Sequence, residues 1–391
     1  MSLYPSLNPT PRFLLGPGPS DAHPAVLRAM STPLLGHLDP QFLELMNQVQ
    51  DMLRRVYLTS NALTLPISAT GMAGMETCFV NLLEPGDKVV VCSVGFFGQR
   101  MIDVAGRTGA EVTVVERPWG EVFSLDQLRE VLKRVRPKVL GIVHAETSTG
   151  AYQPMEEVGK LCREFDTLLV VDAVTSLGCV PVRVDDWGID AVFSCTQKGL
   201  GCPPGLSPVS FGPRALEAMD RRKTKVQSWY LDVGNIRKYL GAERVYHHTA
   251  PISMNYALHE GLRLVLEEGL EARWARHLKN AAALKAGLDA LGLPYTAAEG
   301  HRLPQIHAVR LPDGIDDAKG RKMLLETFGI EVGGGLGDLK GKAWRIGLMG
   351  YNSRPAVVLV LLAALEQVLS RMGAKVSAGA SVAAANAAYS A

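Results

Sequence analysis

The chain has 391 residues, of which 47% are hydrophobic and 20% charged, enough for a large core and more than one compact domain usually holds. Its 41 Lys and Arg residues nearly balance its 39 Asp and Glu residues, which argues against nucleic acid or an anionic membrane surface as the main partner. The longest late apolar run, Val357–Leu365, is too short to span a bilayer, so we expect a soluble protein.

Residues 1–20 contain five prolines and are predicted to form an irregular N-terminal arm. From residue 21 to 265, apolar strand-like runs alternate with helical stretches, which predicts a large α/β domain with a mostly parallel sheet flanked by helices. Its strand candidates are Lys88–Cys92, Glu111–Val115, Val139–His144, Leu168–Asp172, Ala191–Cys195 and Val209–Phe211. The helix candidates include Met72–Leu83, Gly98–Thr108, Leu125–Val135 and Met155–Phe165.

A long helical stretch, Met254 to about Leu291, is predicted to lead into a smaller C-terminal α+β domain over residues 266–373. The candidate strands there are Ile306–Leu311, Glu331–Gly333 and Trp344–Leu348, and the candidate helices are Lys319–Phe328 and Ala356–Met372. Residues 374–391 are mostly Ala, Ser, Gly and Val, and we expect this tail to lack regular structure.

The chain has six cysteines and no C-x-x-C pair, and most of them lie inside apolar runs. A reduced thiol in such a run behaves as a small hydrophobic group, so we expect a reducing, cytoplasmic environment. His247 and His248 are adjacent and cannot share one helical face as metal ligands do, so we expect no metal. The chain also lacks G-x-G-x-x-G, the dinucleotide fingerprint.

Two predicted strands lead into ionisable residues. The run Leu168–Asp172 ends in an aspartate, and the run from Ala191 leads into Lys198, 26 residues after Asp172. In a βαβ unit these ends would face one pocket at the carboxyl edge of the sheet. A lysine amine and a carboxylate beside the pyridine nitrogen are the pair that pyridoxal 5'-phosphate (PLP) chemistry needs. Taken singly, an exposed lysine and a helix-capping aspartate are the more common interpretations.

Three further features fit a cofactor site. Thr70, Gly71 and Met72 begin a predicted helix, whose N-terminus favours a phosphate, although ordinary capping by Thr70 is an alternative. Phe97 would stack on a ring, although an aromatic residue after a strand is more often part of the core. Arg345 interrupts an apolar strand and suits a bidentate grip on a carboxylate; an exposed arginine on an edge strand is the alternative.

Six short segments occur in an order and spacing that is informative as a set. They are Leu14–Ser20 (LLGPGPS), Glu146–Gly150 (ETSTG), Val171–Val174 (VDAV), Gln197–Lys198, Tyr246–Thr249 (YHHT) and Arg345–Gly347 (RIG). Together they resemble the class V aminotransferases of PLP-dependent fold type I, specifically the alanine–glyoxylate / serine–pyruvate aminotransferase group. The likeness covers most of the chain.

The resemblance implies a role for each candidate around the cofactor ring. Lys198 would be the Schiff-base lysine and Asp172 the partner of the pyridine nitrogen. Phe97 would stack on the ring, where relatives often carry tryptophan. Ser148 would lie near the ring hydroxyl and the substrate, and Arg345 would bind the substrate carboxylate.

The resemblance also implies a phosphate site shared between two subunits of a homodimer. One chain would supply Thr70, Gly71, Met72 and Gln197, with Met72 standing where relatives often carry histidine. Tyr246 and Thr249 would reach the phosphate from the second subunit.

The expected function is therefore transfer of the amino group of alanine or serine to a small 2-oxo acid, glyoxylate or pyruvate. A dicarboxylate or aminophosphonate donor is an alternative. A lyase or desulfurase reaction on the same fold is another, although the resemblance places a desulfurase's mobile cysteine late in the chain, and none follows Cys202. A binding module without catalysis would be favoured by loss of the lysine or the acid, and both are present.

Overall fold

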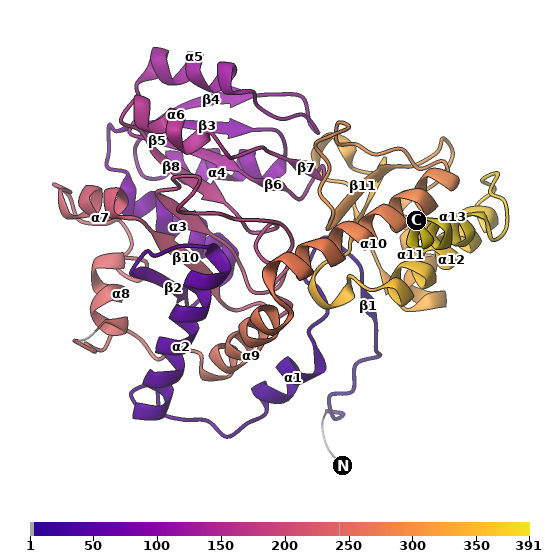
Figure 1. Ribbon diagram of the computed structural model, residues 1–391, viewed down its shortest axis with the longest axis horizontal. Helices are drawn as coiled ribbons and strands as arrows, with labels where there is room; N and C mark the ends of the chain where they lie inside the picture. The colour runs from indigo at the N-terminus through magenta and orange to yellow at the C-terminus, as the bar shows by residue number, and fades with distance from the viewer. Residues whose placement is uncertain (1–3, 242) are drawn as a thin grey trace.

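A seven-stranded sheet forms the centre of the larger lobe in the computed structural model, which describes residues 4–241 and 243–391 (Figure 1). The strand order is β2-β10-β9-β8-β5-β3-β4, and β10 runs antiparallel to both of its neighbours. The other described pairs are parallel, so the expected α/β fold with a mostly parallel sheet is confirmed. The strands are β2 (Leu63–Ile67), β3 (Lys88–Ser93), β4 (Glu111–Glu116), β5 (Val139–Val143), β8 (Leu168–Asp172), β9 (Ala191–Phe193) and β10 (Ser207–Phe211).

Helices cover both faces of this sheet, which explains why its inner strands are apolar throughout. Successive residues of β3 point to opposite faces, so Val89 and Val90 belong to different buried clusters. One face packs against α1 (Pro24–Met30), α2 (Pro40–Tyr57), α5 (Leu125–Val135), α6 (Val158–Glu164) and α9 (Ile252–Glu268). The other packs against α3 (Gly71–Leu82), α4 (Phe96–Gly106), α7 (Pro213–Asp220) and α8 (Val233–Leu240).

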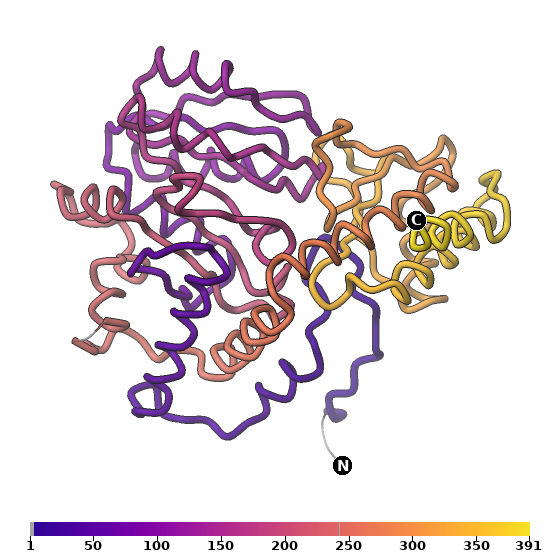
Figure 2. The backbone as a smooth tube through the Cα atoms, in the orientation of Figure 1, coloured from indigo at the N-terminus to yellow at the C-terminus, as the bar shows by residue number. Residues whose placement is uncertain are grey.

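The smaller lobe contains a three-stranded antiparallel sheet in the order β11-β14-β13, with helices packed against it (Figure 1). The N-terminal arm runs beside this lobe (Figure 2), where β1 pairs with β12 and Leu15 enters the core. The elements are β1 (Phe13–Leu14), α10 (Leu270–Ala290), β11 (Ile306–Arg310), α11 (Asp317–Phe328), β12 (Ile330–Glu331), β13 (Gly333–Gly334), β14 (Ala343–Gly347), α12 (Pro355–Arg371) and α13 (Ala380–Ser390), with 3-10 turns at Gly337–Leu339 and Gly350–Asn352.

Two sequence-based predictions are wrong. The single helix expected from Met254 to Leu291 is two helices, α9 and α10, because Gly269 between them adopts a φ of 83°. The tail 374–391, expected to lack regular structure, contains α13. Glu366 on α12 accepts hydrogen bonds from the N–H groups of Gly379 (2.9 Å) and Ser381 (2.7 Å) at the start of that helix. The first difference depends on the backbone conformation of one glycine and the second on contacts with Glu366, and the pattern of apolar residues predicts neither.

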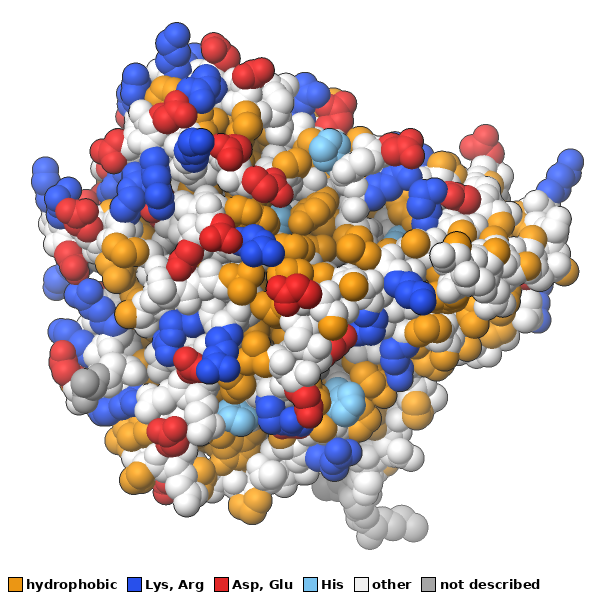
Figure 3. Space-filling model, viewed as in Figure 1, with side chains coloured by type: hydrophobic (Ala, Val, Ile, Leu, Met, Phe, Trp, Pro, Cys, Tyr) orange, Lys and Arg blue, Asp and Glu red, His pale blue; other side chains and the backbone are white. Residues whose placement is uncertain are grey.

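Charged side chains of both signs are interspersed on the face shown in Figure 3. This distribution agrees with the near balance of 41 basic and 39 acidic residues, and no patch of a single sign dominates that face. Within residues 4–241 and 243–391, no helix is both long enough and apolar enough to cross a bilayer.

Candidate active site

A cavity of about 250 Å³ lies at the carboxyl ends of β8 and β9, beside the N-terminus of α3. Seven of the predicted site residues line it: Thr70, Gly71, Met72, Phe97, Asp172, Gln197 and Lys198. The fold therefore gathers into one pocket residues that are up to 128 positions apart, since 198 − 70 = 128. Two larger cavities, of about 790 and 440 Å³, lie elsewhere on the described surface and contain none of these side chains.

Lys198 lies in the loop after β9 with 8% of its surface exposed. Burial lowers the pKa of its amine, because the protein interior disfavours the charged form. The Nζ atom donates a hydrogen bond to the carbonyl oxygen of Pro17, in the N-terminal arm. A buried amine with a lowered pKa is the nucleophile that Schiff-base formation needs.

Asp172 ends β8 and is 2% exposed. Burial raises the pKa of its carboxyl to about 7; the Val174 N–H, which donates to Oδ1 at 2.8 Å, opposes this shift, and the charge of Glu146 adds to it. The hydrogen bonds of Asp172 among the described residues use Oδ1 and leave Oδ2 free. A cationic ring nitrogen placed there would favour the ionised carboxylate.

The N-terminus of α3 suits a phosphate. Thr70 is the N-cap residue but its side chain makes no capping hydrogen bond, and among the described residues the N–H groups of Gly71 and Met72 have no acceptor. A side chain at position 71 would not fit, because its Cβ would lie 2.9 Å from that of Cys195. Gln197 lines the same cavity, and its Oε1 is buried without a partner. Free amides at a helix N-terminus bind anions well.

Phe97 lines the cavity from the first turn of α4, and its ring meets Phe96 edge-on at 5.6 Å between centroids. Ser148 does not lie on the cavity wall. It is fully buried, and its hydroxyl donates to Glu146 Oε1 at 2.6 Å and accepts from the Phe96 N–H at 3.0 Å. Glu146 was absent from the predicted site, although it lies in one of the segments that carried the resemblance.

Arg345 is 8% exposed on β14, in the smaller lobe, and does not line the cavity. Its Nε donates to the carbonyl oxygen of Gly334 at 2.8 Å. Burial lowers the pKa of the guanidinium to about 10, and the charge of Glu146 opposes that shift. The charge of Arg345 also contributes to the lowered pKa of Lys198, so the two cations are electrostatically coupled.

Tyr246 and Thr249 lie outside the cavity of their own chain. Both are exposed, and Tyr246 exposes 59% of its surface. His248, between them, is held beside the loop that precedes α3, because its Nε2 lies 2.6 Å from Ser68 Oγ. His247 stacks on the exposed Trp229 at 4.6 Å between ring centroids. A single chain thus leaves its site without these two predicted residues.

The N-terminal arm also forms part of the cavity wall. Gly18 and Pro19 line it, and neither is among the predicted site residues. Both belong to the segment Leu14–Ser20, which is one of those that carry the resemblance. A signal was nevertheless present, because closely spaced prolines and glycines mark a backbone of fixed and unusual shape.

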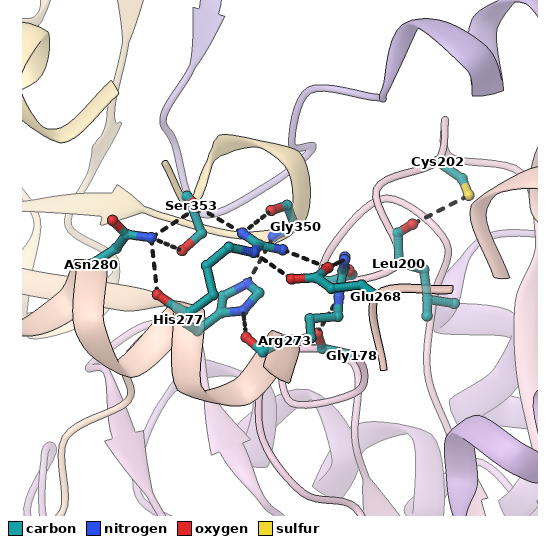
Figure 4. A network of polar contacts seen from close by, with 11 residues as sticks. Gly178, Leu200, Cys202, Glu268, Arg273, His277, Asn280, Gly350 and Ser353 are labelled. Atoms are coloured by element: carbon teal, nitrogen blue, oxygen red, sulfur yellow. Dashed lines mark hydrogen bonds and ion pairs between the residues drawn. The ribbon is translucent and has the colours of Figure 1, made fainter. Parts of the chain in front are cut away.

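A polar network around Arg273 and Glu268 links the loop that follows β9 to α10 and to the smaller lobe (Figure 4). Arg273, on α10, donates to the carbonyl oxygens of Gly178 (2.8 Å) and Gly199 (2.7 Å) and pairs with Glu268 (2.6 Å). Arg276 pairs with the same glutamate, at 2.5 Å, and donates to the carbonyl oxygen of Gly350 at 3.0 Å. The residue that follows Lys198 is therefore tied to the start of the helix that connects the lobes.

Comparisons with known proteins point to one family. The family model for aminotransferase class-V matches residues 13–357. The (S)-ureidoglycine–glyoxylate transaminase of Bacillus subtilis is 41% identical over 386 residues, covering 94% of this chain and 93% of that protein. The alanine–glyoxylate aminotransferase of Mus musculus is 40% identical, covering 92% and 87%. The crystal structure of an alanine–glyoxylate aminotransferase from Nostoc sp. superposes with a TM-score of 0.93 at 54% identity, covering 94% and 98%.

Proposed function

The chain belongs to the class V aminotransferases, and from this membership we infer that it moves the amino group of a small amino acid to a small 2-oxo acid. The cofactor of this reaction is PLP, which supplies an aldehyde for the amine and a ring that accepts electrons. The observation that carries the proposal is the convergence of buried Lys198, buried Asp172 and the free amides of α3 on one cavity.

The residues that line the cavity fit the aldehyde, the ring nitrogen, the ring face and the phosphate of PLP. Lys198 would hold the aldehyde and, once released, move a proton at the α-carbon of the substrate. Asp172 would hold a proton on the ring nitrogen, and the start of α3 with Gln197 would bind the phosphate. Phe97 would stack on one face of the ring. Arg345 would bind the substrate carboxylate when the smaller lobe presents its guanidinium to the cavity.

For the substrates, we propose alanine or serine as donor and glyoxylate or pyruvate as acceptor. Several relatives at about 40% identity are named alanine–glyoxylate aminotransferases. A second candidate donor is (S)-ureidoglycine, because the Bacillus subtilis relative named for it is equally similar. Glyoxylate is the acceptor in both names, so it is the acceptor to test first.

We propose that the active protein is a homodimer in which Tyr246 and Thr249 complete the phosphate site of the partner subunit. The exposure of Tyr246 (59%) and Trp229 (66%) supports this proposal, because large aromatic side chains at a protein surface often mark an interface. We also propose a reducing, cytoplasmic location. All six cysteines are free and buried, which suits a compartment where thiols stay reduced.

An absorption spectrum of the purified protein, with and without substrates, tests the reaction. We expect a visible band from bound PLP that disappears with L-alanine, L-serine or ureidoglycine and returns with glyoxylate. A band that ignores every donor would leave PLP binding in place and exclude these amines. Absence of any band after incubation with PLP would contradict the assignment of Lys198.

A further inference from the structure

Glu146 is a fully buried carboxylate on β6 (Ala145–Glu146). Its Oε2 lies 3.2 Å from the backbone nitrogen of Phe97, the residue proposed to stack on the ring. Burying an ionised carboxylate is costly unless hydrogen bonds or an opposite charge compensate. No ion pair of Glu146 occurs among the described residues. Compensation therefore has to come from hydrogen-bond donors, and these donors lie in the two segments that carry Phe97 and Ser148.

The first group of donors is the N-terminus of α4. The N-cap residue of this helix, Gly95, has no side chain, so α4 cannot cap itself. Glu146 Oε2 instead accepts hydrogen bonds from the N–H groups of Phe97 (3.2 Å) and Gly98 (3.3 Å), the positions that an N-cap side chain would serve. The helix dipole adds a favourable interaction with the carboxylate.

The second group of donors belongs to Ser148. Its N–H and its hydroxyl both donate to Glu146 Oε1, at 3.0 and 2.6 Å. The Ser148 Oγ also accepts the N–H of Phe96, at 3.0 Å. Burial raises the pKa of the Glu146 carboxyl, and its hydrogen bonds with Ser148, Gly98 and Phe97 oppose that shift.

Gly95 permits this close approach. A Cβ at that position would lie 2.5 Å from Cγ and 2.6 Å from Cδ of Glu146, and it would also overlap Ser148 Oγ. The φ of Gly95 is 173°, an extended conformation open to any residue, so the space and not the backbone requires glycine here. A residue larger than glycine at position 95 would displace the side chains of Glu146 and Ser148.

Glu146 also acts on the charged residues of the site. Its charge raises the pKa of Asp172 and opposes the lowering of the Arg345 pKa. The carboxylate is thus electrostatically coupled to one candidate cofactor ligand in the larger lobe and to one candidate substrate ligand in the smaller lobe.

We propose that Glu146 is a positioning residue for the cofactor ring: it anchors the start of the helix that presents Phe97, and it holds Ser148 against the same helix start. This inference rests on the proposed function, because only a ring bound in this cavity would use Phe97. Neither Glu146 nor Ser148 lines the cavity, so both would act through Phe97.

The test compares PLP binding by the apo forms of wild type, Glu146→Gln and a control, Glu116→Gln. Glu116 is an exposed residue at the end of β4, a strand that does not pair with β6. Glutamine at position 146 turns an NH₂ group toward N–H donors, and the loss of buried hydrogen bonds of this kind weakens an interaction about tenfold or more. We expect the Kd for PLP to rise about tenfold, and the visible circular dichroism of bound PLP, which reports ring orientation, to change.

We expect the control to match wild type in both measurements. A purely structural role would lower the melting temperature of apo Glu146→Gln but leave its Kd and dichroism unchanged, and that result would overturn the proposal.

If Glu146→Gln does not fold, the same two measurements are made on Gly95→Ala, because the added methyl group displaces Glu146 and Ser148 without removing either. If Gly95→Ala folds and its bound PLP gives the same circular dichroism as in wild type, the proposal is overturned as well. If wild type itself binds no PLP, the proposed function fails; if wild type binds PLP and the variants behave as wild type, the role of Glu146 fails.

Discussion

Gly18 lies against the side chain of Lys198 so closely that only a glycine fits there. A Cβ at position 18 would lie 2.5 Å from Nζ and 2.8 Å from Cδ of the lysine, and Gly18 has a φ of 126°, which strains any other residue. The preceding carbonyl, of Pro17, accepts the hydrogen bond from the lysine amine. The N-terminal arm therefore shapes the position of a residue 180 places later in the chain, since 198 − 18 = 180.

Replacing Gly18 by alanine is expected to displace Lys198 and to weaken PLP binding by about tenfold or more, because the methyl group and the amine compete for one space. The Kd from a PLP titration of the apo protein checks this. Gly36→Ala is the matched control, since position 36 is exposed and an added Cβ meets nothing within 4 Å. Equal affinity of the two variants would refute the role of Gly18.

Replacing Asp172 by asparagine is expected to change the pH dependence of folding stability in the apo protein. Burial raises the pKa of Asp172 from 3.8 to about 7, so between these pH values the folded state holds a proton that the unfolded state has released. Its contribution to the free energy of unfolding therefore falls as pH rises from about 4 to about 7, and stays level above. The asparagine side chain does not titrate, so the variant lacks this contribution.

Urea unfolding of both apo proteins at several pH values measures this difference. The free energy of unfolding of Asp172→Asn should fall less between pH 5 and pH 8 than that of wild type. Parallel curves would show that Asp172 is already ionised at pH 5. The same variant should bind PLP weakly, because an amide cannot hold a proton on the ring nitrogen by charge.

Replacing Arg345 by lysine is expected to raise the KM for the amino donor by about tenfold or more, because lysine cannot form two parallel hydrogen bonds with a carboxylate. Steady-state kinetics with L-alanine and glyoxylate checks this. Arg310→Lys is the control, on the neighbouring strand β11 with an exposed side chain. An unchanged KM would remove Arg345 from substrate binding.

Replacing Arg273 by lysine is expected to lower both the melting temperature and PLP affinity, because the lysine cannot reach Gly178, Gly199 and Glu268 together. Loss of two hydrogen bonds from a buried charged group costs about 3 kcal/mol. Arg263→Lys is the control: Arg263 makes an exposed pair with Glu260 on α9, and such pairs contribute little. Equal melting temperatures of the two variants would show that the hydrogen bonds of Arg273 contribute no more to stability than an exposed ion pair does.

Mixing two inactive variants tests the dimer. Lys198→Ala lacks the lysine of its own site, and Tyr246→Ala would lack the residue lent to its partner. In a mixed dimer both defects fall on one site and the other is intact, so random mixing should restore about a quarter of wild-type activity. If no activity returns after the mixture is unfolded and refolded, Tyr246 belongs to the site of its own subunit or to neither site.

Elements with strong local signals were predicted at their observed bounds. The strand Leu168–Asp172 is a run of apolar residues that ends in one carboxylate. The helix Leu125–Val135 begins with a capping box, in which the side chains of Ser124 and Gln127 each bond the other's backbone. Most other predicted elements lie within about three residues of the observed ones, as is usual for helix and strand ends.

The remaining differences have their causes outside the local sequence. The apolar pattern continues on both sides of Gly269, so it does not reveal the break between α9 and α10. The tail is rich in small residues, and its helix depends on Glu366 and on burial of Ala385. Composition alone does not supply either contact.

The candidate site divides in the same way. Asp172 could be predicted because it ends one apolar strand, Lys198 because it follows another, and Thr70 to Met72 because they begin a helix. Glu146 could not be predicted, because its role depends on the fold bringing residue 146 beside the start of α4. The role proposed for Tyr246 requires a second subunit, and the arrangement of two subunits cannot be read from the pattern of one chain.

The core of the smaller lobe combines Leu15 with Ala385, residues from near the two ends of the sequence. The strands of the larger sheet, by contrast, all lie between residues 63 and 211. During synthesis the larger sheet can assemble while later residues are still being added, as domains generally fold in the order in which they emerge. The partners of the arm in the smaller lobe come much later in the chain, because β1 pairs with β12 and the carbonyl oxygen of Leu15 accepts a hydrogen bond from the N–H of Gly347. The arm, whose Pro17 carbonyl accepts a hydrogen bond from Lys198, therefore cannot take its final position until residue 347 has been added to the chain.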